Sequence, residues 1–136
     1  MDSELEKAVT FFRFEDLRIY HKALDYIEWL TLRGKTFPND NPAGIGTRFN
    51  LSAQAIALNI SEGSARNKSQ FIYYLKMAKS AVRECVVFTT LAGKLDYLSE
   101  KEVDESRGQL MEMTKMIGAL IGSLQRAADM SMEDTD

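Results

Sequence analysis

Residues 53–85, "AQAIALNISEGSARNKSQFIYYLKMAKSAVREC", decide the fold, because they contain the end of one helix, a short connection and the start of the next. The first residues of this stretch repeat apolar side chains in a helical rhythm. Asn59 and Glu62 then fall in the last turn of that helix, and we expect Gly63 to end it in left-handed geometry. Ser69 is a good N-cap residue for the helix that follows. A connection this short makes the two helices neighbours in space.

The same helical rhythm recurs along the chain, and no strand pattern competes with it. We expect four helices, at about residues 15–33, 45–62, 69–96 and 100–128. Gly34 and Pro38 close the first helix. Ser99 forms a capping box with Glu102, three residues later, at the start of the fourth. Four long helices with short connections predict an all-α protein, an antiparallel up-down-up-down four-helix bundle.

The composition is that of one soluble globular domain of 136 residues, with 45% hydrophobic and 27% charged residues. A single cysteine excludes an intrachain disulfide, which fits a cytoplasmic protein. The acidic N-terminus lacks a signal-peptide pattern, and no apolar run approaches the ~20 residues that span a bilayer. We therefore expect the bundle over residues 14–128, a flexible segment at 1–13 and an acidic disordered tail at 129–136.

Two of the expected helices carry apolar faces wider than the arc of roughly 100° that a bundle core requires. The helix at 15–33 carries two adjacent apolar rows, Leu17, Tyr20, Leu24 and Ile27 beside Ile19, Ala23, Tyr26 and Leu30. The helix at 69–96 is similarly broad, with Phe71, Leu75, Ala78 and Val82 beside Tyr74, Met77, Ala81, Cys85, Phe88, Ala92 and Leu95. Covering the excess takes another copy of the chain, so we expect a homo-oligomer.

Gly118 and Gly122 lie four residues apart in the last expected helix, where each glycine costs about 1 kcal/mol relative to alanine. One interpretation is that a neighbouring backbone approaches closely at these positions. The other is a weakness that the helix tolerates because packing stabilises it.

The sequence shows no acid–base or metal-binding constellation that would carry enzyme chemistry. His21 is the single histidine, and Arg18 stands three residues before it, so the Glu-x-x-His pairs of di-metal bundles cannot form. Cys85 falls within an apolar arc, where a buried, inert thiol is expected. No glycine-rich phosphate loop or dinucleotide fingerprint occurs. We predict no catalytic residue, no cofactor and no metal, and thus a protein that is not an enzyme.

Positive charge is concentrated in the middle of the chain. Residues 64–98 carry six Lys/Arg and two Asp/Glu, a net charge of +4, whereas residues 99–136 carry four and nine, a net charge of −5. One basic face includes Arg66, Lys68, Lys76, Lys79, Arg83 and Lys94. A second, opposite the apolar arc of the first helix, includes Arg18, Lys22, Trp29 and Arg33. These faces could bind nucleic acid or a protein partner, or they could be solvated faces with Trp29 packed on the nearby loop.

Three polar residues adjoin apolar surface and call for partners. We expect Asn59 and Glu62 to tie down the connection before the next helix, where backbone donors are unpaired, although binding and catalysis are alternatives. Glu84 lies at the edge of the wide apolar face, and a carboxylate in that position needs a partner. We expect an ion pair within or between chains, with Arg48 as one candidate.

Three stretches resemble a known family: "FEDLRIYHKALDYI" at 14–27, "NISEGSARNKSQFIYYLKMAKSAVRE" at 59–84 and "LAGKLDYL" at 91–98. They are similar to the four-helix-bundle proteins encoded in intervening sequences of bacterial large-subunit (23S) ribosomal RNA genes. The resemblance covers residues 14–124. The matching positions are Phe14, Leu17, Lys22, Ala23, Asn59, Ile60, Glu62, Gly63, Phe71, Leu75, Ala78 and Glu84.

The resemblance implies a small cytoplasmic, bacterial, non-enzymatic bundle. The accessory variability proteins of diversity-generating retroelements are more distantly similar, and they imply a ring-like homo-oligomer, a pentamer, that binds nucleic acid and a reverse transcriptase. The family commonly places a basic pair in its second helix, where this chain has Asn50 and Leu51, and a Gly-Ser pair where it has Ser80 and Ala81. Both departures weaken the transfer of RNA binding to this chain.

Overall fold

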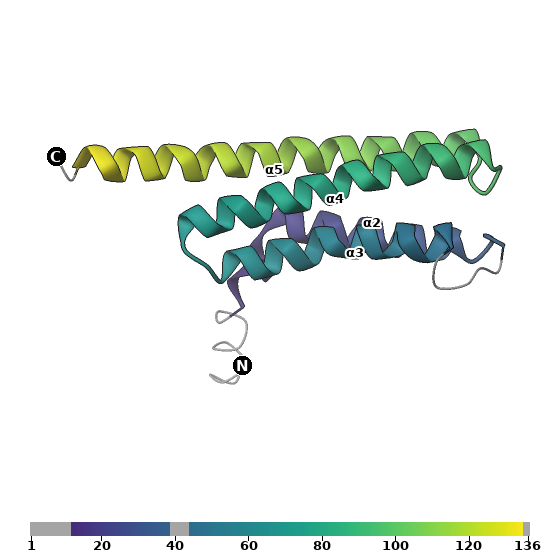
Figure 1. The fold of residues 1–136 in the computed structure, drawn as a ribbon, viewed down its shortest axis with the longest axis horizontal. Helices are drawn as coiled ribbons and strands as arrows, with labels where there is room; N and C mark the ends of the chain where they lie inside the picture. The colour runs from purple at the N-terminus through teal and green to yellow at the C-terminus, as the bar shows by residue number, and fades with distance from the viewer. Residues whose placement is uncertain (1–11, 39–43, 135–136) are drawn as a thin grey trace.

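The computed structural model describes residues 12–38 and 44–134 and shows an all-α protein (Figure 1). A 3-10 turn, η1 (Arg13–Asp16), precedes four long helices, α2 (Arg18–Gly34), α3 (Ile45–Ser64), α4 (Lys68–Lys94) and α5 (Glu100–Asp134). No strand occurs within these residues. The predicted all-α class with four helices is confirmed, whereas the segment expected to be flexible lies, for residues 1–11, outside the described residues.

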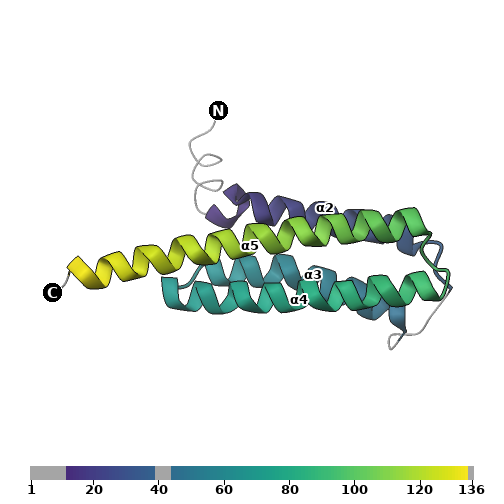
Figure 2. The ribbon, with the colours of Figure 1, turned by 90° about the horizontal axis from the view of Figure 1, so that it is seen from above.

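Each long helix packs against two others, α2 and α4 both contacting α3 on one side and α5 on the other (Figures 1 and 2). Residue pairs between α2 and α5 run in opposite numerical order, from Lys22 beside Glu112 to Arg33 beside Glu102. The colour ramp likewise runs in opposite directions along α4 and α5 (Figure 1). The C-terminal end of α5 projects beyond the first turn of α4 in both views.

The core receives one apolar row from each helix, because residues three and four apart share a helix face. The buried residues of the first three long helices include Ile19, Ala23, Tyr26, Leu30, Phe49, Ala53, Ile56, Ile60, Leu75, Ala78, Val82 and Cys85. From α5 come Leu110, Met113, Ile117 and Ile121. The buried rows of α2 and α4 match those expected from the sequence. The second apolar row of α2, which includes Tyr20 and Leu24, is only partly covered.

Several helix boundaries differ from those expected. Leu17 is extended, with φ −78° and ψ 125°, so α2 begins at Arg18 and not near residue 15. Asn67, not Ser69, is the N-cap of α4, because its side chain accepts a hydrogen bond from the Gln70 amide at 2.9 Å. α5 continues to residue 134, into the segment expected to be a disordered tail.

The prediction that Gly63 ends a helix in left-handed geometry is wrong. No glycine of the described residues has a positive φ, and Gly63 is buried within the last turn of α3. A Cβ added at this position would lie 2.6 Å from Tyr74 Cβ and 3.0 Å from Phe71 Cδ1. Glycine is therefore required because α4 crosses here at close range, which the sequence of α3 alone does not reveal.

The turn between α4 and α5 is closed by backbone and side-chain hydrogen bonds. The Tyr97 amide donates to the Ala92 carbonyl at 2.9 Å and the Asp96 amide donates to Gly93 at 3.1 Å, the two bonds of a Schellman motif. Asp96 occupies the left-handed position at φ 60°, where glycine is usual. The predicted capping box is confirmed: Ser99 Oγ accepts from the Glu102 amide, and the Glu102 carboxylate accepts from the Ser99 amide.

Gly118 has open space where a Cβ would stand, so no backbone approaches it. At Gly122 the nearest atom belongs to the flexible end of Arg126, at 3.2 Å. Within this chain the two glycines are therefore a tolerated weakness rather than a close-packing site.

Candidate nucleic-acid interface

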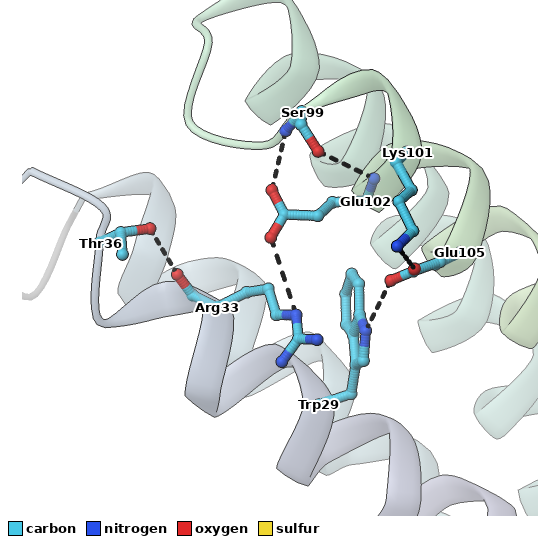
Figure 3. A network of polar contacts seen from close by, with 7 residues as sticks. All are labelled: Trp29, Arg33, Thr36, Ser99, Lys101, Glu102 and Glu105. Carbon is cyan, nitrogen blue, oxygen red and sulfur yellow. Dashed lines mark hydrogen bonds and ion pairs between the residues drawn. The ribbon is translucent and has the colours of Figure 1, made fainter.

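The basic face predicted for the first helix lies against α5 (Figure 3). Trp29 Nε1 donates to Glu105 Oε2 at 3.2 Å, and the Arg33 guanidinium lies over the Trp29 ring, 5.2 Å from its centroid. Lys22 Nζ is 3.3 Å from Glu112 Oε1. The placement of these side chains opposite the apolar arc, away from the bundle, was therefore wrong. A helical wheel gives the angle of each side chain but not the position of the fourth helix.

Glu102 joins the start of α5 to the end of α2 (Figure 3). One carboxylate oxygen accepts from the Ser99 amide at 2.9 Å, and the other lies 3.7 Å from Arg33 Nε. The capping box is thus extended into an ion pair between helices. Lys22 and Arg33 of the basic face on α2 lie beside carboxylates of α5, so the positive charge of that face is largely neutralised within the chain. Arg18 alone of the predicted set on α2 is exposed, with no ion pair in the described residues.

The basic face of α4 has the opposite character. We define the α4 basic row as Lys68, Lys76, Lys79, Arg83 and Lys94. All but the half-buried Lys79 are exposed, and none forms an ion pair within the described residues. At about 1.5 Å per residue the row extends roughly 40 Å along one helix. It is a surface of uncompensated positive charge that could attract a polyanion.

Arg66 precedes the α4 basic row in the sequence, but its guanidinium already has partners within the chain. Its guanidinium forms an ion pair with Glu62 and lies over the Tyr74 ring, 5.6 Å from the centroid. The hydrogen bond to Glu62 raises the pKa of Arg66 above its ordinary value. Glu62 therefore ties down the connection after α3, but through the Arg66 side chain and not through the backbone donors that were expected. Asn59 does not, because its side-chain amide donates to the Ala55 carbonyl of its own helix at 2.8 Å.

Glu84 has a different partner from the one expected. Its carboxylate accepts from Ser52 Oγ at 2.9 Å, across the α3–α4 contact. Arg48 forms no ion pair with it in the described residues, and its guanidinium lies over the Phe88 ring, 5.9 Å from the centroid. The predicted ion pair between Arg48 and Glu84 therefore does not form within one chain. Both residues line the same groove with Leu51 and Val87.

A buried chain of hydroxyl groups, which sequence reasoning missed, joins α2, α5 and α4. Tyr26 and Ser106 lie 2.8 Å apart, Ser106 and Thr89 lie 2.7 Å apart, and Thr89 donates to the Cys85 carbonyl. Each hydroxyl has one hydrogen, so the last bond fixes the others: Ser106 donates to Thr89, and Tyr26 donates to Ser106. Burial raises the pKa of Tyr26, which keeps it a donor. The sequence signal that could have predicted this chain is Ser106, a small hydroxyl residue within the apolar row of α5.

Cys85 is buried beside this chain, as predicted for an inert thiol. Desolvation raises its pKa to about 12. His21, by contrast, is exposed on α2 and hydrogen-bonded to the Glu15 carbonyl. In the described ranges no three His, Cys, Asp or Glu side chains gather where they could hold a metal ion.

Exposed apolar side chains are concentrated on the outer faces of α3 and α4. Leu58 is 65% exposed, Val87 64% and Leu51 58%, more than any large apolar residue described on α2. A groove of about 390 Å³ between α2 and α3 is lined by Leu24, Ile27 and Leu58, among others. The expected wide apolar surface is present, but its most exposed residues include Leu51 and Leu58 of α3, a helix that was not among the two expected to carry a wide apolar face.

Four long helices, a hydroxyl-linked core and a basic row on α4 without ion-pair partners in the described residues define an all-α helical protein. A family model described as 23S rRNA-intervening sequence protein matches residues 15–119. The chain belongs to this family, which confirms the resemblance of its helical motifs. No curated protein matches the chain. None of the described helices has an apolar stretch that would carry it across a bilayer.

Proposed function

We propose that this protein is a non-catalytic, cytoplasmic, antiparallel helix bundle that assembles into a ring of identical copies and binds RNA or another nucleic acid through the α4 basic row. The opposite numerical order of residue pairs between α2 and α5 supports the antiparallel arrangement. The exposed leucines of α3 and Val87 of α4 support self-association, because exposed apolar patches mark interaction surfaces.

One observation supports the nucleic-acid part of the proposal: within the described residues, cations of the basic face on α2 form ion pairs, whereas those of the α4 basic row do not. Lys22 and Arg33 of α2 lie beside carboxylates of α5. Lys76 and Arg83 of α4 are exposed with no carboxylate partner in the described part of the chain. Uncompensated cations in one row suit a phosphate backbone, and several copies in a ring would multiply the contacts.

The experiment is a binding titration of labelled RNA by fluorescence anisotropy at low and moderate salt. The test variant is Lys76→Glu/Lys79→Glu/Arg83→Glu, and we expect it to lose most binding at low salt because it replaces attraction by repulsion. The matched control is Lys35→Glu/Lys101→Glu/Lys115→Glu, which changes the net charge equally away from α4. We expect the control to retain much of the affinity. Equal losses in both variants would overturn the assignment to α4.

A second candidate function is a protein-binding adaptor with no nucleic-acid contact of its own, as for a polymerase-like partner. The α2–α3 groove favours this function, because its lining includes the exposed Leu24 and Leu58. A Leu24→Asp/Leu58→Asp variant should lose such a partner in a pull-down from host extract, and the wild type should bind no RNA in the anisotropy titration. RNA binding by the wild type that this variant retains would instead favour the α4 proposal.

A further inference from the structure

We propose that an unpaired nucleobase stacks on Tyr73, in a hollow between the start of α4 and the end of α5, so that the ligand is single-stranded rather than duplex nucleic acid. This inference rests on the proposed nucleic-acid function and specifies its substrate class. It concerns a residue outside the α4 basic row and a contact that charge alone would not make.

Tyr73 is unusual among the aromatic residues that the structure describes. It is 58% exposed, more than Phe12 at 47%, and the other described Phe, Tyr and Trp rings are half-buried or buried. Its ring meets Tyr74 edge-on, at 5.3 Å between centroids and an interplanar angle of 84°. Tyr74 in turn lies under the Arg66 guanidinium. The Tyr74 ring is thus covered by a side chain of the α3–α4 connection, while the neighbouring Tyr73 ring is exposed to solvent.

The surroundings of Tyr73 suit a base and its backbone. We define the Tyr73 hollow, about 390 Å³ in volume, by its lining of Ser69, Ile72, Tyr73, Lys76, Gln125 and Asp129. This volume is within the range of small-ligand sites. Lys76, one helical turn from Tyr73 on the same side of α4, can neutralise a phosphate. The amide of Gln125 and the carboxylate of Asp129 offer hydrogen-bonding groups for the edge of a base.

The geometry selects single strands because a base in a duplex has both faces stacked on its neighbours and its polar edge paired. Only an unpaired base can place one face on Tyr73 and turn its edge toward α5. Asp129 would also repel a phosphate placed in the hollow itself, so the backbone would run along Lys76 and the rest of the α4 basic row. Aromatic platforms beside cationic rows are the usual arrangement for single strands.

The test compares labelled single-stranded RNA with its duplex form in anisotropy titrations of the full chain. Tyr73→Ala should weaken binding of the single strand about tenfold or more, the typical loss of one stacked base, and change duplex binding less than about twofold. Tyr73→Phe should keep the affinity, because stacking needs the ring and not the hydroxyl. Phe12→Ala, the matched removal of an exposed aromatic away from α4, should have no effect. A single strand carrying 2-aminopurine should be quenched by wild type but not by Tyr73→Ala.

Two outcomes separate this inference from the proposed function. If charge reversal on α4 abolishes binding but Tyr73→Ala binds the single strand as well as wild type does, the stacking inference is overturned and the basic row stands. If charge reversal has no effect, the proposed function fails. A Tyr73→Ala variant whose assembled mass changes, with unchanged affinity per copy, would identify Tyr73 as a contact between copies and overturn the inference.

Discussion

Tyr26 donates its hydroxyl hydrogen to Ser106 across the α2–α5 contact, at an O···O distance of 2.8 Å and with both residues fully buried. Ser106 then donates to Thr89 of α4, so one polar chain links three helices. Hydroxyls buried in an apolar core are costly unless every hydrogen has an acceptor. The chain therefore specifies the relative rotation of α2, α4 and α5 as well as contributing to stability.

The order of this chain predicts a larger cost for removing its middle hydroxyl, Ser106, than for removing its first, Tyr26. Ser106→Ala removes the acceptor of Tyr26 and the donor to Thr89, so it should cost about 1–3 kcal/mol. Tyr26→Phe removes only a donor at the end of the chain and should cost about 1 kcal/mol. Urea unfolding followed by circular dichroism measures both values. A larger loss for Tyr26→Phe than for Ser106→Ala would contradict the assigned direction.

Gly63 and Gly118 should respond in opposite ways to alanine. At Gly63 a Cβ would lie 2.6 Å from Tyr74 Cβ, so Gly63→Ala should force α3 and α4 apart and cost about 1–3 kcal/mol. At Gly118 nothing lies within 4 Å, so Gly118→Ala should stabilise the helix by about 1 kcal/mol. Thermal melts of the two variants compare the positions directly. Stabilisation by Gly63→Ala would show that the two helices do not approach so closely.

Asp96 should be improved by glycine. Its φ of 60° is strained for a residue with a Cβ, by roughly 1 kcal/mol, and glycine at the same position of a Schellman motif is not. Asp96→Gly should therefore raise the melting temperature, whereas the β-branched Asp96→Val should lower it. If both substitutions lowered the melting temperature equally, the Asp96 side chain, and not its backbone conformation, would be what matters.

Stability should fall at alkaline pH because of the buried thiol. Burial raises the pKa of Cys85 from 9.0 to about 12 in the folded chain. The folded state thus favours the protonated thiol, so its contribution is complete below about pH 9 and is lost as the pH rises toward 12. The raised pKa of Tyr26 acts in the same direction above pH 10. Denaturant unfolding from pH 8 to 11 should show this fall, and Cys85→Ala should flatten it. A curve unaltered by the substitution would refute the assignment.

The sequence predicted what depends on one helix at a time. The core row of Ile19, Ala23, Tyr26 and Leu30 follows from helical periodicity. The Ser99 capping box follows from local spacing.

Features that depend on a neighbouring helix were missed or misplaced. Lys22 and Arg33 were expected to be exposed, because a wheel of α2 does not show where α5 packs. Gly63 was given a turn role because the crossing of α4 has no trace in the sequence of α3. The basic residues of both faces could be named from the sequence, but only the packed structure shows that Lys22 and Arg33 lie beside carboxylates, whereas the α4 basic row has no ion-pair partner in the described residues.

The salt dependence of RNA affinity tests the central claim most directly, because each neutralised phosphate contributes a slope of about −0.7 to −0.9 to a plot of log affinity against log salt. We predict a steep slope for wild type, one shallower by about that amount for each of Lys76→Gln, Lys79→Gln and Arg83→Gln, and an unchanged slope for Lys35→Gln. A wild-type slope near zero, or equal effects of Lys35→Gln and the α4 substitutions, would contradict the claim that the α4 basic row is the binding surface.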